Sequence, residues 1–183
     1  MAQIILTAFE PFLGRKANKS LEVLQNVMSD NVKGLEAIVF PVAFRDFERE
    51  FKHIRKHKPR YILSMGESPY ESPKLERKAK NFIECKGRPD NDGRIIEKER
   101  IIEHAPDFYL ATMDYDSIAL HVKKAKYKIK RSSNAGSYVC NFLLYRLLHE
   151  FNDASIGFIH VPNSGKVGYS TDVAHIVIDF LKK

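Results

Sequence analysis

Cys140 has the sequence position of a nucleophile. It follows a polar turn at residues 133–137 and begins an apolar segment, residues 138–151, whose pattern predicts a helix. Unpaired backbone N–H groups and the helix dipole favour a negatively charged sulfur at a helix start, and a thiolate there is a usable nucleophile. The same N–H groups would stabilise the oxyanion that forms when the sulfur attacks a carbonyl. The other cysteine, Cys85, is expected to be a structural or surface thiol.

His160 is placed to serve as the base for this thiol. The predicted helix carries the chain about 18 Å away from Cys140, because each helical residue rises about 1.5 Å. The predicted strand at residues 155–161 returns the chain by about 20 Å, at about 3.3 Å per residue. Both side chains should therefore lie at the carboxyl edge of the sheet, where α/β folds bind their ligands. There His160 can deprotonate the sulfur and later protonate a leaving amine.

A carboxylate is the usual third group, since it orients the imidazole and stabilises its positive charge. Glu76 follows the carboxyl end of another predicted strand, across the loop at residues 66–75. Glu67, Glu71 and Glu84 are near the same edge by the same reasoning. The residue pattern alone therefore leaves the choice among four carboxylates open.

The elements that must position these groups alternate along the chain. Short β-branched apolar runs predict strands, and apolar residues at helical spacing predict helices. The expected strands cover residues 3–8, 35–42, 61–65, 126–131 and 155–161, and the expected helices cover residues 20–28, 44–57, 117–124 and 138–151, with a last one ending at Leu181. This alternation predicts an α/β layered fold with a mostly parallel, twisted sheet.

Some local features are also predicted. Ser20 is the expected N-cap of the first helix, and Ser170 or Thr171 that of the last. Strand-like alternation is expected at residues 76–85. Residues 86–104 contain several Gly, Pro, Asn and Asp residues, so we expect a long connection or a projecting hairpin there.

The composition indicates one domain spanning residues 1–183. The chain is 44% hydrophobic, long enough for one substantial core, and contains no repeat or low-complexity linker. Two cysteines and an opening segment without a basic-then-apolar leader predict a cytoplasmic location. No apolar run approaches the roughly 20 residues that a membrane helix needs. No cofactor is predicted, and no metal centre either, because His53 and His57 occur on a basic, surface-type helix.

The net charge of +7 raises the alternative of an RNA- or polyanion-binding module. Basic residues cluster at residues 123–131 and 45–60, but a solvated strand face and helix face explain both clusters more simply. Nucleic acid is therefore not the expected partner. A purely structural interpretation also exists, in which Cys140 is a small buried apolar group and His160 a hydrogen-bonded core residue.

Three motifs resemble those of the pyroglutamyl peptidases (pyrrolidone carboxyl peptidases), which are cysteine peptidases. Residues 9–14 (FEPFLG) resemble the family's FEPFGG, residues 133–141 (SNAGSYVCN) its SNTAGTFVCN, and residues 157–162 (GFIHVP) its GFIHIP. Residues 76–81 (ERKAKN) and 89–93 (PDNDG) are weaker matches to ERVAIN and PDNEG. All five occur in the family's order.

The resemblance implies that Cys140 is the nucleophile, His160 the base and acid, and Glu76 the residue that orients His160. It thus selects one carboxylate where topology does not. It also implies a three-layer α/β/α sandwich of the phosphorylase/hydrolase type, commonly assembled as homo-oligomers, either dimers or tetramers. The implied substrate is a peptide with an N-terminal pyroglutamate.

The resemblance further implies a substrate pocket in which Phe9 and Phe12 pack against the flat lactam ring and Asn18 helps to close the site. One departure concerns this pocket, because Glu67 stands where the family has glutamine. An ionised carboxylate only accepts hydrogen bonds, so Glu67 could serve the lactam N–H but not its carbonyl. Its charge should also raise the pKa of the Cys140 thiol. A relative with a changed acyl substrate or weakened activity is therefore the main alternative.

Overall fold

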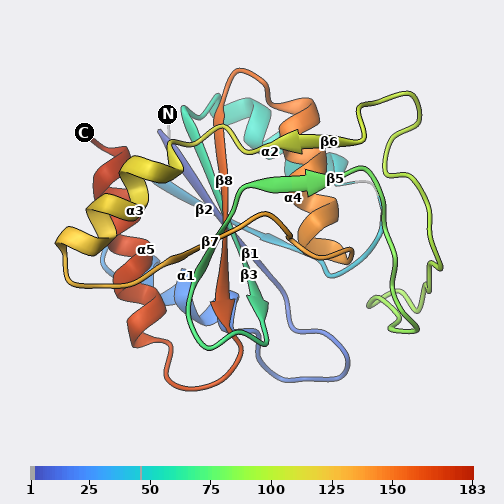
Figure 1. Cartoon of the computed structure of the whole chain (residues 1–183), viewed down its shortest axis with the longest axis horizontal. Helices are drawn as coiled ribbons and strands as arrows, with labels where there is room; N and C mark the ends of the chain where they lie inside the picture. The colour runs from blue at the N-terminus through green and yellow to red at the C-terminus, as the bar shows by residue number, and fades with distance from the viewer. Residues whose placement is uncertain (1–2, 46) are drawn as a thin grey trace.

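The central sheet has six strands, in a computed structural model that describes residues 3–45 and 47–183. The spatial order is β2–β1–β3–β8–β4–β7 (Figure 1). The strands are Ile4–Phe9 (β1), Leu35–Phe40 (β2), Tyr61–Ser68 (β3), Lys74–Glu76 (β4), Lys130–Ser132 (β7) and Ser155–Pro162 (β8). All neighbours are parallel except β4 and β8, which are antiparallel. The predicted mostly parallel sheet is confirmed, although β7 is shorter than the strand expected at residues 126–131.

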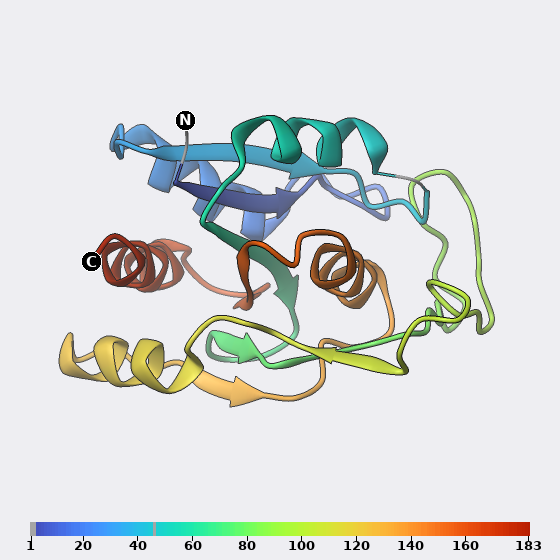
Figure 2. The same ribbon diagram turned by 90° about the horizontal axis from the view of Figure 1, so that it is seen from above.

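Helices cover both faces of this sheet. One face carries Lys19–Ser29 (α1), Tyr115–Lys124 (α3) and Gly168–Leu181 (α5), and the other carries Glu48–His57 (α2) and Val139–Glu150 (α4). Figure 2 shows α4 and α5 on opposite sides of the central strands. Strands β1, β3 and β8 are buried almost throughout, as is typical of a parallel sheet between two helical layers. The three-layer α/β/α prediction is confirmed.

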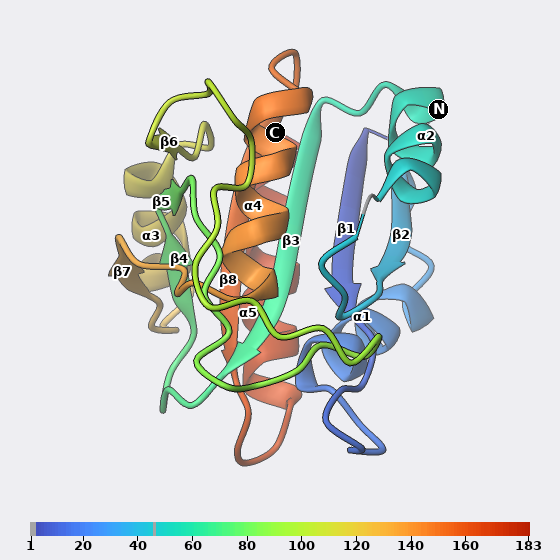
Figure 3. The same ribbon diagram turned by 90° about the vertical axis from the view of Figure 1, so that its right-hand side faces the viewer.

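A two-stranded hairpin stands beside this core. Lys78–Lys80 (β5) pairs antiparallel with Phe108–Leu110 (β6), and the connection between them runs past α4 (Figure 3). Asn81 fastens it internally, because its Oδ1 accepts the N–H groups of Ile101 and Ile102. The long hairpin connection predicted at residues 86–104 is therefore confirmed, whereas strand β6 was not predicted.

Three expected helix starts differ from the structure. Asn18, not Ser20, caps α1, since the Asn18 side chain accepts the Ser20 N–H at 3.0 Å. Helix α2 begins at Glu48 rather than at residue 44, and residue 46 lies outside the described part of the chain. Helix α5 already begins at Gly168, so Ser170 and Thr171 fall within its first turn and neither is the cap.

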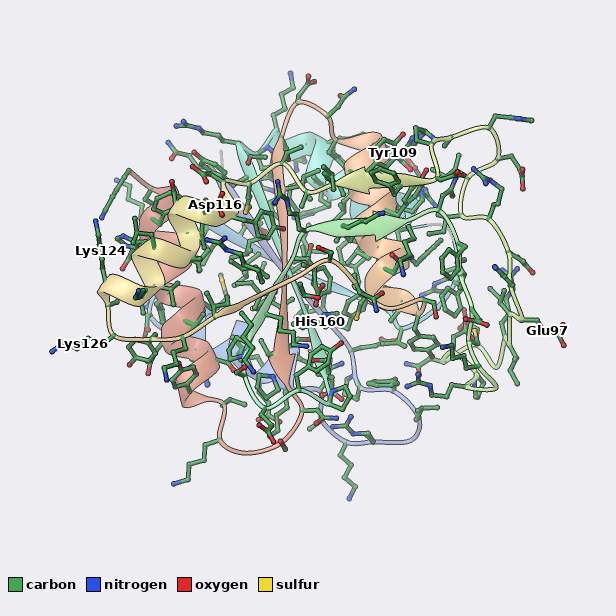
Figure 4. The ribbon with its side chains drawn as sticks, in the orientation of Figure 1. Glu97, Tyr109, Asp116, Lys124, Lys126 and His160 are labelled. Atoms are coloured by element: carbon green, nitrogen blue, oxygen red, sulfur yellow. The ribbon has the colours of Figure 1, made fainter. Side chains whose placement is uncertain are left out.

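The basic segment at residues 123–131 lies away from the core of the sheet. Figure 4 shows Lys124 and Lys126 pointing outward, far from His160. Arg131 is paired with Asp116 at 2.9 Å, which uses part of the segment's charge internally. These observations favour a solvated surface over a nucleic-acid site. No helix in the described part of the chain has the length and apolar character needed to cross a membrane.

Candidate active site

His160 lies near the carboxyl end of β8, where three strands meet. In the parallel pair β3–β8 it is opposite Gly66, and in the antiparallel pair β4–β8 it is opposite Lys74. Because side chains alternate along a strand, Glu76 projects from β4 on the same side as Lys74. The short antiparallel strand thus brings a carboxylate to the histidine.

The side chains of His160 and Glu76 form a buried hydrogen-bonded pair. His160 Nδ1 lies 2.9 Å from Glu76 Oε1, and the two residues are 5% and 0% exposed. The other carboxylate oxygen accepts the backbone N–H of Asn134 at 3.3 Å. With Nδ1 engaged, Nε2 is the ring nitrogen left for a second partner. Among the four carboxylates that topology allowed, the structure pairs Glu76 with the imidazole.

Cys140 is the second residue of α4 and lies against the β3 backbone at the level of His160. A Cβ atom built on Gly66 would be only 2.6 Å from Cys140 Sγ and 2.9 Å from the Phe158 ring. Gly66 is the strand partner of His160, so the sulfur packs over the β3–β8 pair at that position. Cys140 and His160 also line the same cavity. The predicted return of both side chains to one edge is therefore observed.

The start of α4 leaves backbone donors beside the sulfur. Tyr138, the N-cap, makes no side-chain capping bond. Within the described residues, the N–H groups of Val139 and Asn141 have no protein acceptor, and the N–H of Cys140 interacts only with its own sulfur. The first intrahelical bond is from Phe142 to Tyr138. Such open N–H groups are suited to hold a developing oxyanion.

The electrostatics of Cys140 differ from the sequence-based expectation. Burial raises the pKa of the Cys140 thiol to about 12, and the negative charges of Glu76 and Glu67 act in the same direction. A backbone N–H group favours the thiolate, but desolvation outweighs it. Burial thus opposes the effect of the helix start and favours the neutral thiol in the unliganded site, whereas the predicted effect of Glu67 has the correct sign.

A cavity of about 270 Å³ opens next to the sulfur. Phe9 and Phe12 line it, as predicted, and Tyr138 adds a third aromatic wall 6.4 Å from the Phe12 ring. Asn18 also lines the cavity, but its polar atoms are already engaged, because its amide donates to Glu10 O and its oxygen caps α1. Asn18 therefore holds the pocket loop in place rather than offering a free polar group.

Glu67 lines the cavity with its charge already paired. Arg15 donates to both carboxylate oxygens, and the backbone N–H of Lys19 donates to Oε2 at 2.8 Å. The Glu67 side chain is 3% exposed and Arg15 is 39% exposed. Arg15 also lies over the Phe12 ring, 5.6 Å from its centroid. The carboxylate thus faces the first turn of α1, where the helix dipole favours it.

Several supporting residues were not predicted. Asn141, which is fully buried, ties the start of α4 to the hairpin through bonds to Lys80 and Phe82. The sequence signal for this role was a single amide side chain, Asn141, next to Cys140 in a mostly apolar helix. Gly66 was seen only as the end of a strand, and Arg15 gave no local pattern, because its partner is 52 residues away.

Comparisons with known proteins agree with this site. A sequence profile described as pyroglutamyl peptidase matches residues 2–171. The pyrrolidone-carboxylate peptidase of Thermococcus onnurineus is 35% identical over 168 residues, which cover 87% of this chain and 83% of that protein. Its counterpart in Oceanobacillus iheyensis is 30% identical over 181 residues, which cover 94% and 90%.

Solved structures give the same result. The crystal structure of the pyrrolidone carboxyl peptidase from Fervidobacterium islandicum superposes with a TM-score of 0.89 at 26% identity, covering 100% of this chain and 99% of that one. The enzyme from Pyrococcus furiosus superposes with a TM-score of 0.87 at 25% identity, covering 98% and 97%.

The close approach of Cys140 to Gly66 generates a first prediction. In Gly66→Ala the new methyl group forces the sulfur or the Phe158 ring to move. Unfolding free energy should fall by about 1–3 kcal/mol, as is usual for overpacking. Any catalysis that depends on the sulfur should fall by about 100-fold, because a 1 Å misplacement can cost that much. Gly168→Ala is the control, since its Cβ meets nothing within 4 Å. Unchanged turnover in Gly66→Ala would contradict the assigned packing.

The raised thiol pKa generates a second prediction. Alkylation of Cys140 by iodoacetamide should accelerate steadily from pH 6 to pH 10 without a plateau, because a pKa of about 12 keeps the thiol protonated. Glu67→Gln removes one of the charges that raise this pKa, so alkylation at pH 8 should become faster. Glu22→Gln, which removes a carboxylate paired with Lys19 on α1, should leave the rate unchanged. A plateau near pH 7 in the wild type would refute the resting neutral thiol.

Proposed function

Because the chain belongs to the pyroglutamyl peptidase family, we propose that it removes N-terminal pyroglutamate from peptides through a covalent thioester formed on Cys140. The observation that carries this proposal is the shared edge of β3 and β8. There the Cys140 sulfur packs on Gly66, Gly66 is paired with His160, and His160 is hydrogen-bonded to Glu76.

The first half of the reaction transfers the pyroglutamyl group to sulfur. The Cys140 thiol gives its proton to His160 Nε2 while the sulfur bonds to the carbonyl carbon next to the scissile C–N bond. The open N–H groups at the start of α4 stabilise the resulting oxyanion. His160 then gives the proton to the leaving nitrogen, the C–N bond breaks, and the shortened peptide departs.

The second half restores the enzyme. His160 takes a proton from water, whose oxygen attacks the thioester carbonyl. Collapse of this intermediate breaks the C–S bond, releases pyroglutamate and returns the proton to sulfur. Throughout, Glu76 keeps the imidazole oriented and stabilises its positive form, as the acidic partner of a catalytic triad does.

The raised thiol pKa assigns a particular role to the substrate. Burial favours the neutral form of the resting sulfur, so we expect proton transfer to His160 to accompany binding or attack. A substrate carbonyl placed against the α4 N–H groups makes that transfer favourable, because negative charge then moves from sulfur to a stabilised oxygen. A neutral thiol also protects the site from oxidation and alkylation between turnovers.

The cavity suits a small, neutral, flat ring. Phe9, Phe12 and Tyr138 supply apolar contact area, and the volume of about 270 Å³ has room for a single flat ring. The second candidate function, hydrolysis of a different acyl group, is favoured by one observation. Glu67 lines this cavity, and a substrate with an additional N–H donor would use it.

Turnover of a pyroglutamyl-coumarin amide provides the third prediction. The wild type should release the fluorophore, and Cys140→Ser should reduce kcat/KM at least about 1,000-fold, since removal of a nucleophile costs that much or more. Cys85→Ser should retain turnover, because Cys85 is fully buried outside the cavity. If the wild type and Cys140→Ser behave identically, the peptidase proposal fails. Turnover of another cyclic or acyl amide in place of the pyroglutamyl one would support the second candidate.

The Arg15–Glu67 pair provides the fourth prediction. Arg15→Ala should raise KM for a neutral lactam substrate at least about fivefold, or roughly 1 kcal/mol, because an uncompensated carboxylate then lies on the pocket wall. The double variant Arg15→Ala with Glu67→Gln should recover most of this loss. Additive losses in the double variant would show that the two residues act independently. The comparison uses kcat and KM measured separately.

A further inference from the structure

A cluster of three potential metal ligands lies on the surface, outside the candidate active site. Glu36 projects from β2, the edge strand, and His53 and His57 are one turn apart on α2. Figure 3 shows α2 beside β2. One ligand atom from each of the three residues lies within 4.8 Å of the other two. None of the three residues lines the cavity that contains Cys140.

The distances fit a tetrahedral ion. Zinc binds imidazole nitrogen and carboxylate oxygen at about 2.0–2.2 Å, so two such ligands at a tetrahedral angle are about 3.3–3.5 Å apart. His53 Nε2 and Glu36 Oε1 are 3.3 Å apart, which is the edge of that tetrahedron. His57 must approach by at most about 1.4 Å, which a side-chain rotation at the end of the helix supplies.

The neighbouring groups leave the three ligands available. The rings of His53 and His57 are 4.8 Å apart, and the His57 side chain makes no hydrogen bond within the described part of the chain. Two cations, Arg55 and Lys56, lie between them in sequence. Arg55 is held by Glu48 and Glu150 and does not compete for Glu36. Two imidazoles and one carboxylate form a recognised zinc donor set, with water as the fourth ligand at an exposed site.

The geometry points to a surface Zn²⁺ site formed by Glu36, His53 and His57, independent of the proposed peptidase chemistry. On binding, each histidine ligates through a neutral ring nitrogen, and any proton on that nitrogen leaves to solvent. The ion then cross-links the edge strand β2 to the last turn of α2. Because the folded chain assembles these ligands and the unfolded chain does not, binding stabilises the fold by mass action.

The fifth prediction is tested by titrating Zn²⁺ into the full chain by calorimetry, with thermal unfolding measured in parallel. All variants carry Cys140→Ser, because a thiol next to His160 also binds zinc. The parent should bind one equivalent and unfold at a higher temperature with zinc. Mg²⁺ should not replace it, since Mg²⁺ prefers oxygen ligands and octahedral geometry.

Variants of the ligands separate this site from unspecific binding. Loss of a residue that only hydrogen-bonds to a metal ligand weakens metal binding about 10–100-fold. Loss of a ligand itself should cost no less, so His53→Ala, His57→Ala and Glu36→Gln should each lower the zinc affinity at least about tenfold. His175→Ala is the matched control, because His175 pairs with the single carboxylate of Asp30 at 2.9 Å. Unfolding without metal verifies that each variant is folded. Unchanged zinc affinity in folded His57→Ala, or no binding to the parent, would overturn the proposal.

Discussion

The hydrogen bond between Glu76 and His160 is the interaction on which the rest of the site depends. A carboxylate with 0% exposure is costly unless its oxygens are satisfied, and here both are, by His160 and by the Asn134 backbone. The Tyr115 hydroxyl anchors the same residue by donating to the Glu76 carbonyl at 2.7 Å. In the sheet, the antiparallel register of β4 against β8 places Lys74 opposite His160, so Glu76, two residues further along β4, lies on the same face as the histidine.

The position of the Cys140 sulfur affects both its packing against Gly66 and its ionisation. A side chain at Gly66 would collide with the Cys140 sulfur, so the glycine permits this close packing, which desolvates the sulfur on the side of the sheet. Desolvation then outweighs the favourable end of α4 and keeps the thiol protonated. The helix start therefore contributes more as a set of N–H donors for an oxyanion than as a means of holding a thiolate in the resting enzyme.

The order of the long strands and helices could be predicted because it follows from local apolar spacing, whereas the three-residue strands β4 and β6 could not. The meeting of Cys140 with His160 could be predicted from element lengths. What could not be predicted depends on contacts between distant residues. Asn18 rather than Ser20 is the N-cap of α1, because the Asn18 side chain donates to the Glu10 carbonyl and accepts the Ser20 N–H in the first turn. The pairing of Arg15 with Glu67 joins two loops whose approach is visible only in the folded chain.

The weak sequence match at residues 89–93 lies in the long connection between β5 and β6, and its residues hydrogen-bond to groups around the pocket. Asp90 accepts the Phe44 N–H, Asn91 donates to Glu10 and Pro11, and Pro89 accepts the Tyr138 hydroxyl. These bonds connect the loop after β1, which carries Phe12, and the start of α4 to the same hairpin connection. The same logic accounts for Glu67. Arg15 and the Lys19 N–H hold the Glu67 carboxylate and compensate its charge. The aromatic residues of the pocket can therefore pack beside it.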